Sequence, residues 1–104
     1  MRSPRSLSTR PRLGKGGHIE RPWVTSPSYE AAIRVLIATR KELGLSQRDL
    51  AERLGKPRSF VSKIENRERR LDFVELVAVA RAMKLMPADL MAKVDAELPD
   101  KLEF

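Results

Sequence analysis

The sequence predicts an all-α domain of five short helices, preceded by a disordered basic arm. Apolar residues recur at helical spacing throughout residues 28–104. Strict apolar–polar alternation and hairpin turn dipeptides, which are typical of strands, are absent. Residues 1–27 differ in composition, because they hold four of the seven prolines, three of the five glycines and few large apolar residues. Such a segment cannot bury enough surface to offset its ordering entropy. We therefore predict a flexible arm over residues 1–27 and one folded domain over residues 28–104.

Capping residues delimit the first two helices. Ser26, Pro27 and Ser28 supply a cap and a proline suited to the first helical position, and Gly44 ends this helix. Ser46 and Asp49 form a capping-box pair for a second helix, which extends to Gly55. The inward faces of the two helices hold Tyr29, Ala32, Ile33, Leu36, Ile37 and Arg40, followed by Leu50, Ala51 and Leu54.

The remaining three helices follow from similar signals. A third helix, about residues 57–66, begins at Pro57 and has Phe60, Val61 and Ile64 on its apolar face. Asp72 and Glu75 cap a fourth helix that is apolar over most of its circumference, which is typical of a central helix. A fifth helix lies between Pro87 and Pro99 and contains Leu90, Met91, Val94 and Leu98.

Composition excludes several classes of function. At 104 residues the chain fits one small domain whose core is marginal. With no cysteine and only His18, it has little from which to build a metal site or a histidine-based catalytic site. We expect neither an enzyme nor a bound metal or cofactor. The apolar stretches are much shorter than the roughly 18 residues of a membrane span, and the basic amino terminus does not resemble a secretory signal. We therefore expect a soluble cytoplasmic protein that does not enter a membrane.

The positive charge is concentrated in two segments. The chain carries a net charge of +7. Residues 1–27 carry six basic side chains against Glu20, a net charge of +5. Residues 53–70 carry seven basic side chains against Glu65 and Glu68, again a net charge of +5. Clustered positive charge favours an anionic partner such as nucleic acid.

The second and third helices show the spacing of a helix-turn-helix. Two helices that meet at a steep angle need a small residue at their contact, a glycine in the turn and a branched apolar residue facing back. Ala51, Gly55 and Val61 supply these residues in order, with Gln47 before and Ile64 after them. Any helical hairpin could carry the same alanine and glycine, so the spacing alone leaves a purely structural role open.

The run GLSQRDLAERLGKPRSFVSKIE, residues 44–65, resembles the lambda-repressor-like (Cro/XRE) helix-turn-helix family. The similarity extends over about residues 32–94. It implies a five-helix domain and a sequence-specific transcription regulator, a repressor that binds a pseudo-palindromic double-stranded DNA operator as a homodimer. One alternative remains open: an antitoxin-like or adaptor protein that binds a partner protein, through the arm or the last helix, as well as DNA.

The resemblance also implies roles for individual residues. A B-DNA major groove about 12 Å wide admits one helix, and arginine or lysine can donate to guanine. The base-contacting candidates on the third helix are Arg58, Ser59, Ser62 and Lys63. The phosphate-contacting candidates are Ser46, Gln47, Asn66, Arg67, Arg69 and Arg70. Arg40 and Glu65 match a pair that forms a buried salt bridge in the family.

Several positions allow two interpretations. Arg67 stands where the family usually has Gly or Asn in a left-handed conformation, so either Asn66 or Arg67 adopts it. Lys84 replaces the glycine common after the fourth helix. Phe60 is either partly buried or packed on a thymine methyl group, and Trp23 either docks on the first helix or contacts a partner. Leu90, Met91, Val94 and Leu98 are predicted to form the dimer interface, the alternative being that Leu90 and Val94 complete the monomer core.

Overall fold

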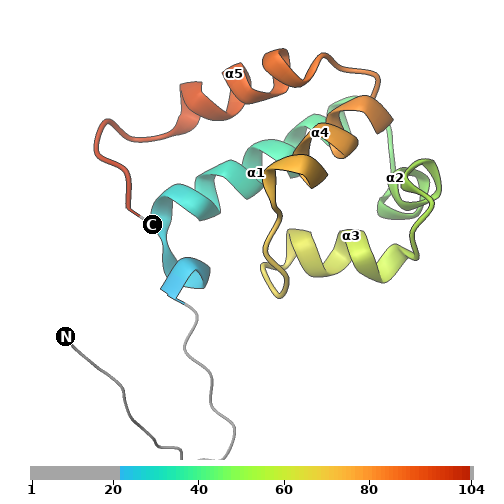
Figure 1. Ribbon diagram of the computed structural model, residues 1–104, viewed down its shortest axis with the longest axis horizontal. Coiled ribbons are helices and arrows are strands. Elements are labelled where there is room, and N and C mark those ends of the chain that lie inside the picture. The colour runs from blue at the N-terminus through green and yellow to red at the C-terminus, as the bar shows by residue number, and fades with distance from the viewer. Residues whose placement is uncertain (1–21, 104) are drawn as a thin grey trace, which may run out of the picture.

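The five predicted helices are present in the computed structural model, which describes residues 22–103. In chain order the elements are η1 (Pro22–Thr25), α1 (Pro27–Glu42), α2 (Gln47–Leu54), α3 (Arg58–Glu65), α4 (Phe73–Ala82) and α5 (Pro87–Glu97). Figure 1 shows α5 alongside α1, with α3 on the opposite side of α1. No strand occurs in the part of the chain that the structure describes, and the all-α class is confirmed. None of the helices in residues 22–103 is long and apolar enough to span a membrane.

The folded domain begins earlier than composition indicates. The predicted arm includes residues 22–27, but Pro22–Thr25 form the short 3-10 helix η1. The Trp23 ring packs edge-on against Tyr29, with 5.1 Å between ring centroids. Trp23 therefore docks on α1, since Tyr29 belongs to that helix. An aromatic pair of this kind stabilises the fold by more than the area it buries accounts for. The rest of the predicted arm, residues 1–21, lies outside the described residues.

Local caps fix the ends of α2 and α4. The Ser46 hydroxyl accepts from the Asp49 N–H and the Asp49 carboxylate accepts from the Ser46 N–H, each at 2.9 Å. Asp72 and Glu75 make the same reciprocal pair at the start of α4. Arg67, with φ of 59°, adopts the left-handed conformation after α3, whereas Asn66 has an ordinary φ of −86°. Lys84 is also left-handed, with φ of 62°.

The core is assembled from all five α-helices. Its buried members are Ile33, Leu36, Leu50, Ala51, Val61, Ile64, Val79, Ala80, Met83 and Leu90. Leu90 is 0% exposed and Val94 is 8% exposed, because α5 packs against α1 and α4. The prediction that these two side chains form a dimer interface is therefore corrected, since they belong to the monomer core. Met91 remains exposed and Leu98 is half-buried.

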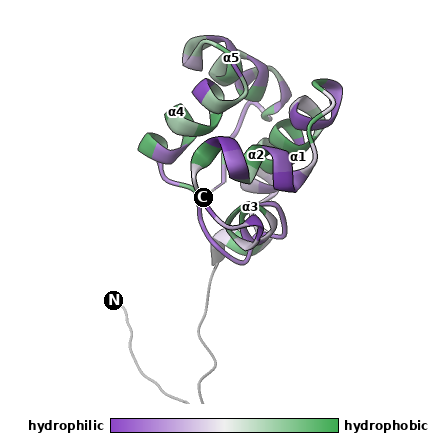
Figure 2. Ribbon diagram, turned by 90° about the vertical axis from the view of Figure 1, so that its right-hand side faces the viewer, coloured by the Kyte–Doolittle hydropathy of each residue, from purple (hydrophilic) through white to green (hydrophobic). Residues whose placement is uncertain are grey.

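Helix α4 is less central than its apolar composition predicts. Val79 and Ala80 are buried, but Phe73 is 80% exposed and Val74 is 64% exposed. Figure 2 shows α4 at one edge of the view, with hydrophobic residues along much of its ribbon. The helix therefore has apolar side chains on its outward side as well as on its inward side.

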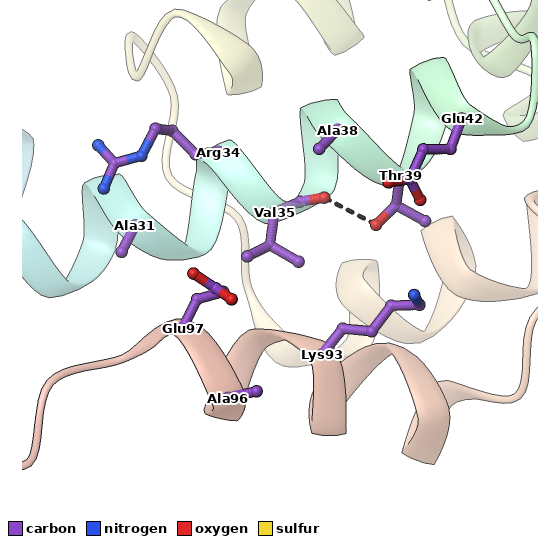
Figure 3. A pocket seen from close by; sticks show the side chains of 9 residues that line it. All are labelled: Ala31, Arg34, Val35, Ala38, Thr39, Glu42, Lys93, Ala96 and Glu97. Atoms are coloured by element: carbon purple, nitrogen blue, oxygen red, sulfur yellow. Dashed lines mark hydrogen bonds between the residues drawn. The ribbon is translucent and has the colours of Figure 1, made fainter.

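A shallow groove runs between α1 and α5, on the side of α1 that faces away from α3. Figure 3 shows the side chains that line it, which are Ala31, Arg34, Val35, Ala38, Thr39, Glu42, Lys93, Ala96 and Glu97. Its volume is about 410 Å³, and the Thr39 hydroxyl inside it donates to the Val35 carbonyl at 2.8 Å. No cluster of residues that could hold a metal ion occurs in residues 22–103. The groove is lined by small side chains and by charged side chains from both helices.

The carboxyl-terminal tail returns to the start of α1, as Figure 1 shows. The Glu103 N–H donates to the Ser28 hydroxyl at 3.0 Å, and the Ser26 hydroxyl donates to the Glu103 carbonyl. Both ends of the described chain thus meet at the amino terminus of α1.

Candidate nucleic-acid interface

A tight turn sets the angle between α2 and α3. Ala51 and Val61 are 2% and 3% exposed, as expected for residues at a close helix–helix contact. Gly55 follows α2 with φ of 68°, a left-handed backbone conformation that residues other than glycine adopt less readily. A Cβ atom at Gly55 would meet nothing within 4 Å. Glycine is therefore favoured here by the backbone conformation and not by lack of space.

The outward face of α3 holds the four predicted base-contacting residues. Arg58, Ser59 and Lys63 are exposed, and Ser62 is half-buried with its hydroxyl donating to the Ser59 carbonyl at 3.3 Å. Val61 and Ile64 hold the opposite face of the helix in the core. Among residues 22–103, no acidic side chain forms an ion pair with Arg58 or Lys63. These two cations are thus available to an anionic partner.

A buried ion pair fixes the position of α3 relative to α1. Arg40 Nε lies 2.7 Å from Glu65 Oε2, and Arg40 Nη2 donates to Oε1 at 2.9 Å. The Gln47 amide donates to the same Glu65 oxygen at 2.9 Å, and Arg40 also donates to the Leu45 carbonyl at 2.7 Å. Both charged side chains are 8% exposed. The carboxylate therefore joins α1, the start of α2 and the end of α3.

The first residues of α2 combine capping with predicted phosphate contacts. The Ser46 backbone N–H and hydroxyl, which hydrogen-bond with Asp49, lower the pKa of its carboxyl group. Gln47 uses one amide N–H for Glu65, which leaves its second N–H for another acceptor. The helix end has free backbone N–H groups of the kind that suit a phosphate oxygen.

The loop after α3 is attached to the amino-terminal part of the domain. Arg67 Nε donates to the Val24 carbonyl at 3.2 Å, and its Nη1 lies 3.4 Å from Glu30 Oε2. The Arg70 guanidinium lies 5.6 Å from the Trp23 ring centroid and 5.4 Å from that of Tyr29. Contacts with η1 and α1 therefore hold this loop in place. The same loop contains most of the predicted phosphate-contacting residues.

Arg69 is held at the same loop by α3 and α4. It donates to both oxygens of Glu75, at 2.8 and 2.6 Å, and lies 4.7 Å from the centroid of the Phe60 ring. These hydrogen bonds from Arg69 lower the pKa of Glu75 to about 2. Lys56 Nζ lies 5.5 Å from the same ring centroid. Phe60 is therefore a half-buried residue beside two cations, which is the first of its two interpretations.

Sequence reasoning missed the residues that hold the loop. No motif includes Glu30, and the helical pattern places Tyr29 only on the apolar face of α1, although its hydroxyl accepts from the Leu71 N–H at 3.1 Å. Asn66, the remaining loop candidate, is exposed and ends α3. A local signal existed only for Trp23, an isolated aromatic residue close to the Ser26 cap.

The fold and the surface of α3 define a helix-turn-helix domain of the DNA-binding class. In that class the second helix of the motif, which corresponds to α3, enters the major groove. A helix-turn-helix family model matches residues 36–90. A solved structure, the XRE-family like protein from Pseudomonas syringae pv. tomato str. DC3000, is 43% identical, with a TM-score of 0.63 and coverage of 69% of this chain and 88% of that chain. No curated protein matches. This chain belongs to the XRE-type helix-turn-helix family of transcription regulators.

Proposed function

We propose that the protein is a sequence-specific double-stranded DNA-binding repressor with α3 as its recognition helix. The observation that carries this proposal is the exposed face of α3, where Arg58 and Lys63 have no ion-pair partner among the described residues. Arg58 and Lys63 would donate to guanine O6 and N7, and the hydroxyls of Ser59 and Ser62 would pair with either donors or acceptors on the bases. Repression would follow from occupying DNA that the transcription machinery needs.

The phosphate contacts would come from the start of α2 and from the loop after α3. The proposed residues are Ser46, Gln47, Asn66, Arg67, Arg69 and Arg70. Arg69 and Arg70 are already oriented by Glu75 and by the two aromatic rings, respectively. Such ordering supports the proposal, because side chains held in place lose less entropy when they bind phosphate.

Two copies would be needed for a specific operator. One recognition helix with four base-facing side chains covers only a few base pairs, too few to distinguish one site among roughly 10⁶ or more competing sites. A homodimer would place two recognition helices in successive turns of the major groove, with half-site centres about 34 Å apart. The operator would then be pseudo-palindromic.

Selection of bound duplexes from random DNA, at one stated salt concentration, tests the proposal. Arg58→Ala should cost about 1 to 3 kcal/mol on the selected site and relax the preference at one base pair. Arg70→Ala should weaken binding to all duplexes alike and reduce the salt slope by about one. Arg34→Ala is the control, because Arg34 is exposed on α1 and, among residues 22–103, forms an ion pair with Glu30 alone. Equal losses on selected and random DNA for both test variants would refute the assignment.

A further inference from the structure

Helix α4 carries an apolar face that the described chain does not cover. Phe73, Val74, Val77, Ala78 and Arg81 have the spacing i, i+1, i+4, i+5 and i+8, which places them on one side of a helix. Phe73 and Val74 are among the most exposed large hydrophobic side chains, Ala78 is exposed, and Val77 is half-buried. The opposite side of α4 packs into the core through Val79 and Ala80. We refer to these five residues as the outward face of α4.

The distribution of charge does not favour DNA as the occupant of this face. Residues 22–70 carry 11 basic and 6 acidic side chains, a net charge of +5. Residues 71–103 carry 4 basic and 7 acidic side chains, a net charge of −3. A polyanion is attracted to the first part and repelled by the second. The outward face of α4 is thus better suited to a protein than to nucleic acid.

The outward face is also complementary to itself. Phe73 lies at the amino-terminal end of this face, and the exposed Arg81 lies near its carboxyl-terminal end. Two such helices packed antiparallel bring a cation and an aromatic ring together at both ends and apolar side chains together in the middle. A two-fold axis produces this arrangement, since every contact in such an interface occurs twice.

We propose that a second copy of this chain covers the outward face, with the two α4 helices antiparallel about a two-fold axis near Val77. Phe73 of each copy then lies opposite Arg81 of the other, where the cation can sit on the ring. Ala78 is small enough to permit close approach of the helices. This interface rests on the proposed function, which requires a dimer. It replaces the interface predicted on α5, because Leu90 and Val94 are buried within one copy.

Residues 1–21 are a poorer occupant of this face. They contain six basic residues against one acidic residue. Their large aliphatic side chains are few and widely spaced, namely Met1, Leu7, Leu13 and Ile19. A basic segment would meet the exposed Arg81 without gaining a continuous apolar contact.

Cysteine cross-linking tests the interface directly, because the natural chain contains no cysteine. Ala78→Cys would place one thiol near the axis, where the Cα atoms of two copies can reach the roughly 4.4 to 6.8 Å that a disulfide needs. Ala92→Cys is the matched control, an exposed alanine on α5. With diamide as oxidant and no DNA present, the first variant should form covalent dimers at least about tenfold faster, because only its thiols meet the required geometry. Equal rates would overturn the proposal.

Sedimentation of the full chain at micromolar concentration provides the second test. Val74→Asp should abolish association, since it brings two like charges into the interface, whereas Met86→Asp, an exposed apolar residue outside this face, should not. Loss of association in Met91→Asp but not in Val74→Asp would assign the interface to α5 and overturn the proposal. These readouts do not require DNA. A chain that cross-links as predicted but binds no DNA would therefore refute the proposed function and leave the interface standing.

Discussion

Removal of the Glu65 carboxylate should destabilise the domain far more than removal of an exposed charge. The carboxylate accepts two hydrogen bonds from Arg40 and one from Gln47. In Glu65→Ala the Arg40 guanidinium stays buried, with the Leu45 carbonyl as its remaining acceptor among these groups. Loss of one partner of a buried ion pair costs about 3 to 5 kcal/mol. The whole domain is expected to be stable by only about 5 to 15 kcal/mol.

This loss should be visible in thermal and urea denaturation. For a domain of this size each kcal/mol corresponds to a shift of about 4 to 8 °C, so Tm should fall by at least about 12 °C. Replacing both residues, as in Arg40→Met with Glu65→Leu, should cost much less, because no buried charge is left unpaired. Arg34→Ala is the control, since its pair with Glu30 is 65% and 45% exposed and should contribute no more than about 0.5 kcal/mol. A Glu65→Ala protein that melts with the wild type would refute the reasoning.

Three further predictions concern acid stability, backbone strain and the loop after α3. The pKa of Glu75 is lowered from 4.5 to about 2, so the contribution of its carboxylate to the free energy of unfolding is complete above pH 4.5 and is lost as the pH falls towards 2. Urea denaturation over this range should therefore show a shallower loss of stability for Glu75→Gln than for the wild type. Parallel stability curves for the two proteins would contradict this. Lys84→Gly should raise the free energy of unfolding by up to about 1 kcal/mol in urea denaturation, because Lys84 is left-handed, whereas Lys84→Ala should not. Trp23→Ala removes one of the two rings beside Arg70 and should weaken DNA binding about two- to fivefold with an unchanged salt slope. DNA titrations at several salt concentrations measure this, with Trp23→Phe as the control. A salt slope reduced by one would instead indicate direct loss of a phosphate contact.

The helix boundaries could be predicted because their causes are local. Both partners of each capping box lie within four residues of sequence, and α2 and α4 begin directly after Ser46 and Asp72. The tight turn is equally local, since glycine is the residue that adopts its left-handed conformation at the lowest cost, and Gly55 occupies that position. The face of α3 that carries Arg58 and Lys63 follows from helical spacing once the helix is placed.

Contacts between distant segments could not be predicted in this way. An apolar helix face shows the same pattern whether its own chain or another copy covers it, and for this reason the predicted interface on α5 wrongly includes Leu90 and Val94. The same ambiguity makes α4 look central in the sequence, although Phe73 is exposed. The partner of Arg67 is Glu30, 37 positions earlier in the chain, a pairing that no sequence spacing indicates.

The separation of charge between residues 22–70 and residues 71–103 has a consequence for the speed of encounter. A body with one positive and one negative part behaves as an electric dipole, and a polyanion exerts a torque on it before contact. The domain would then approach DNA with α3 and its neighbouring loop leading, so that fewer collisions occur in an unproductive orientation. Specific docking without such guidance slows association from near 10⁹ to about 10⁵–10⁷ M⁻¹s⁻¹. Added salt shortens the range of the torque, so the association rate should decrease as ionic strength rises.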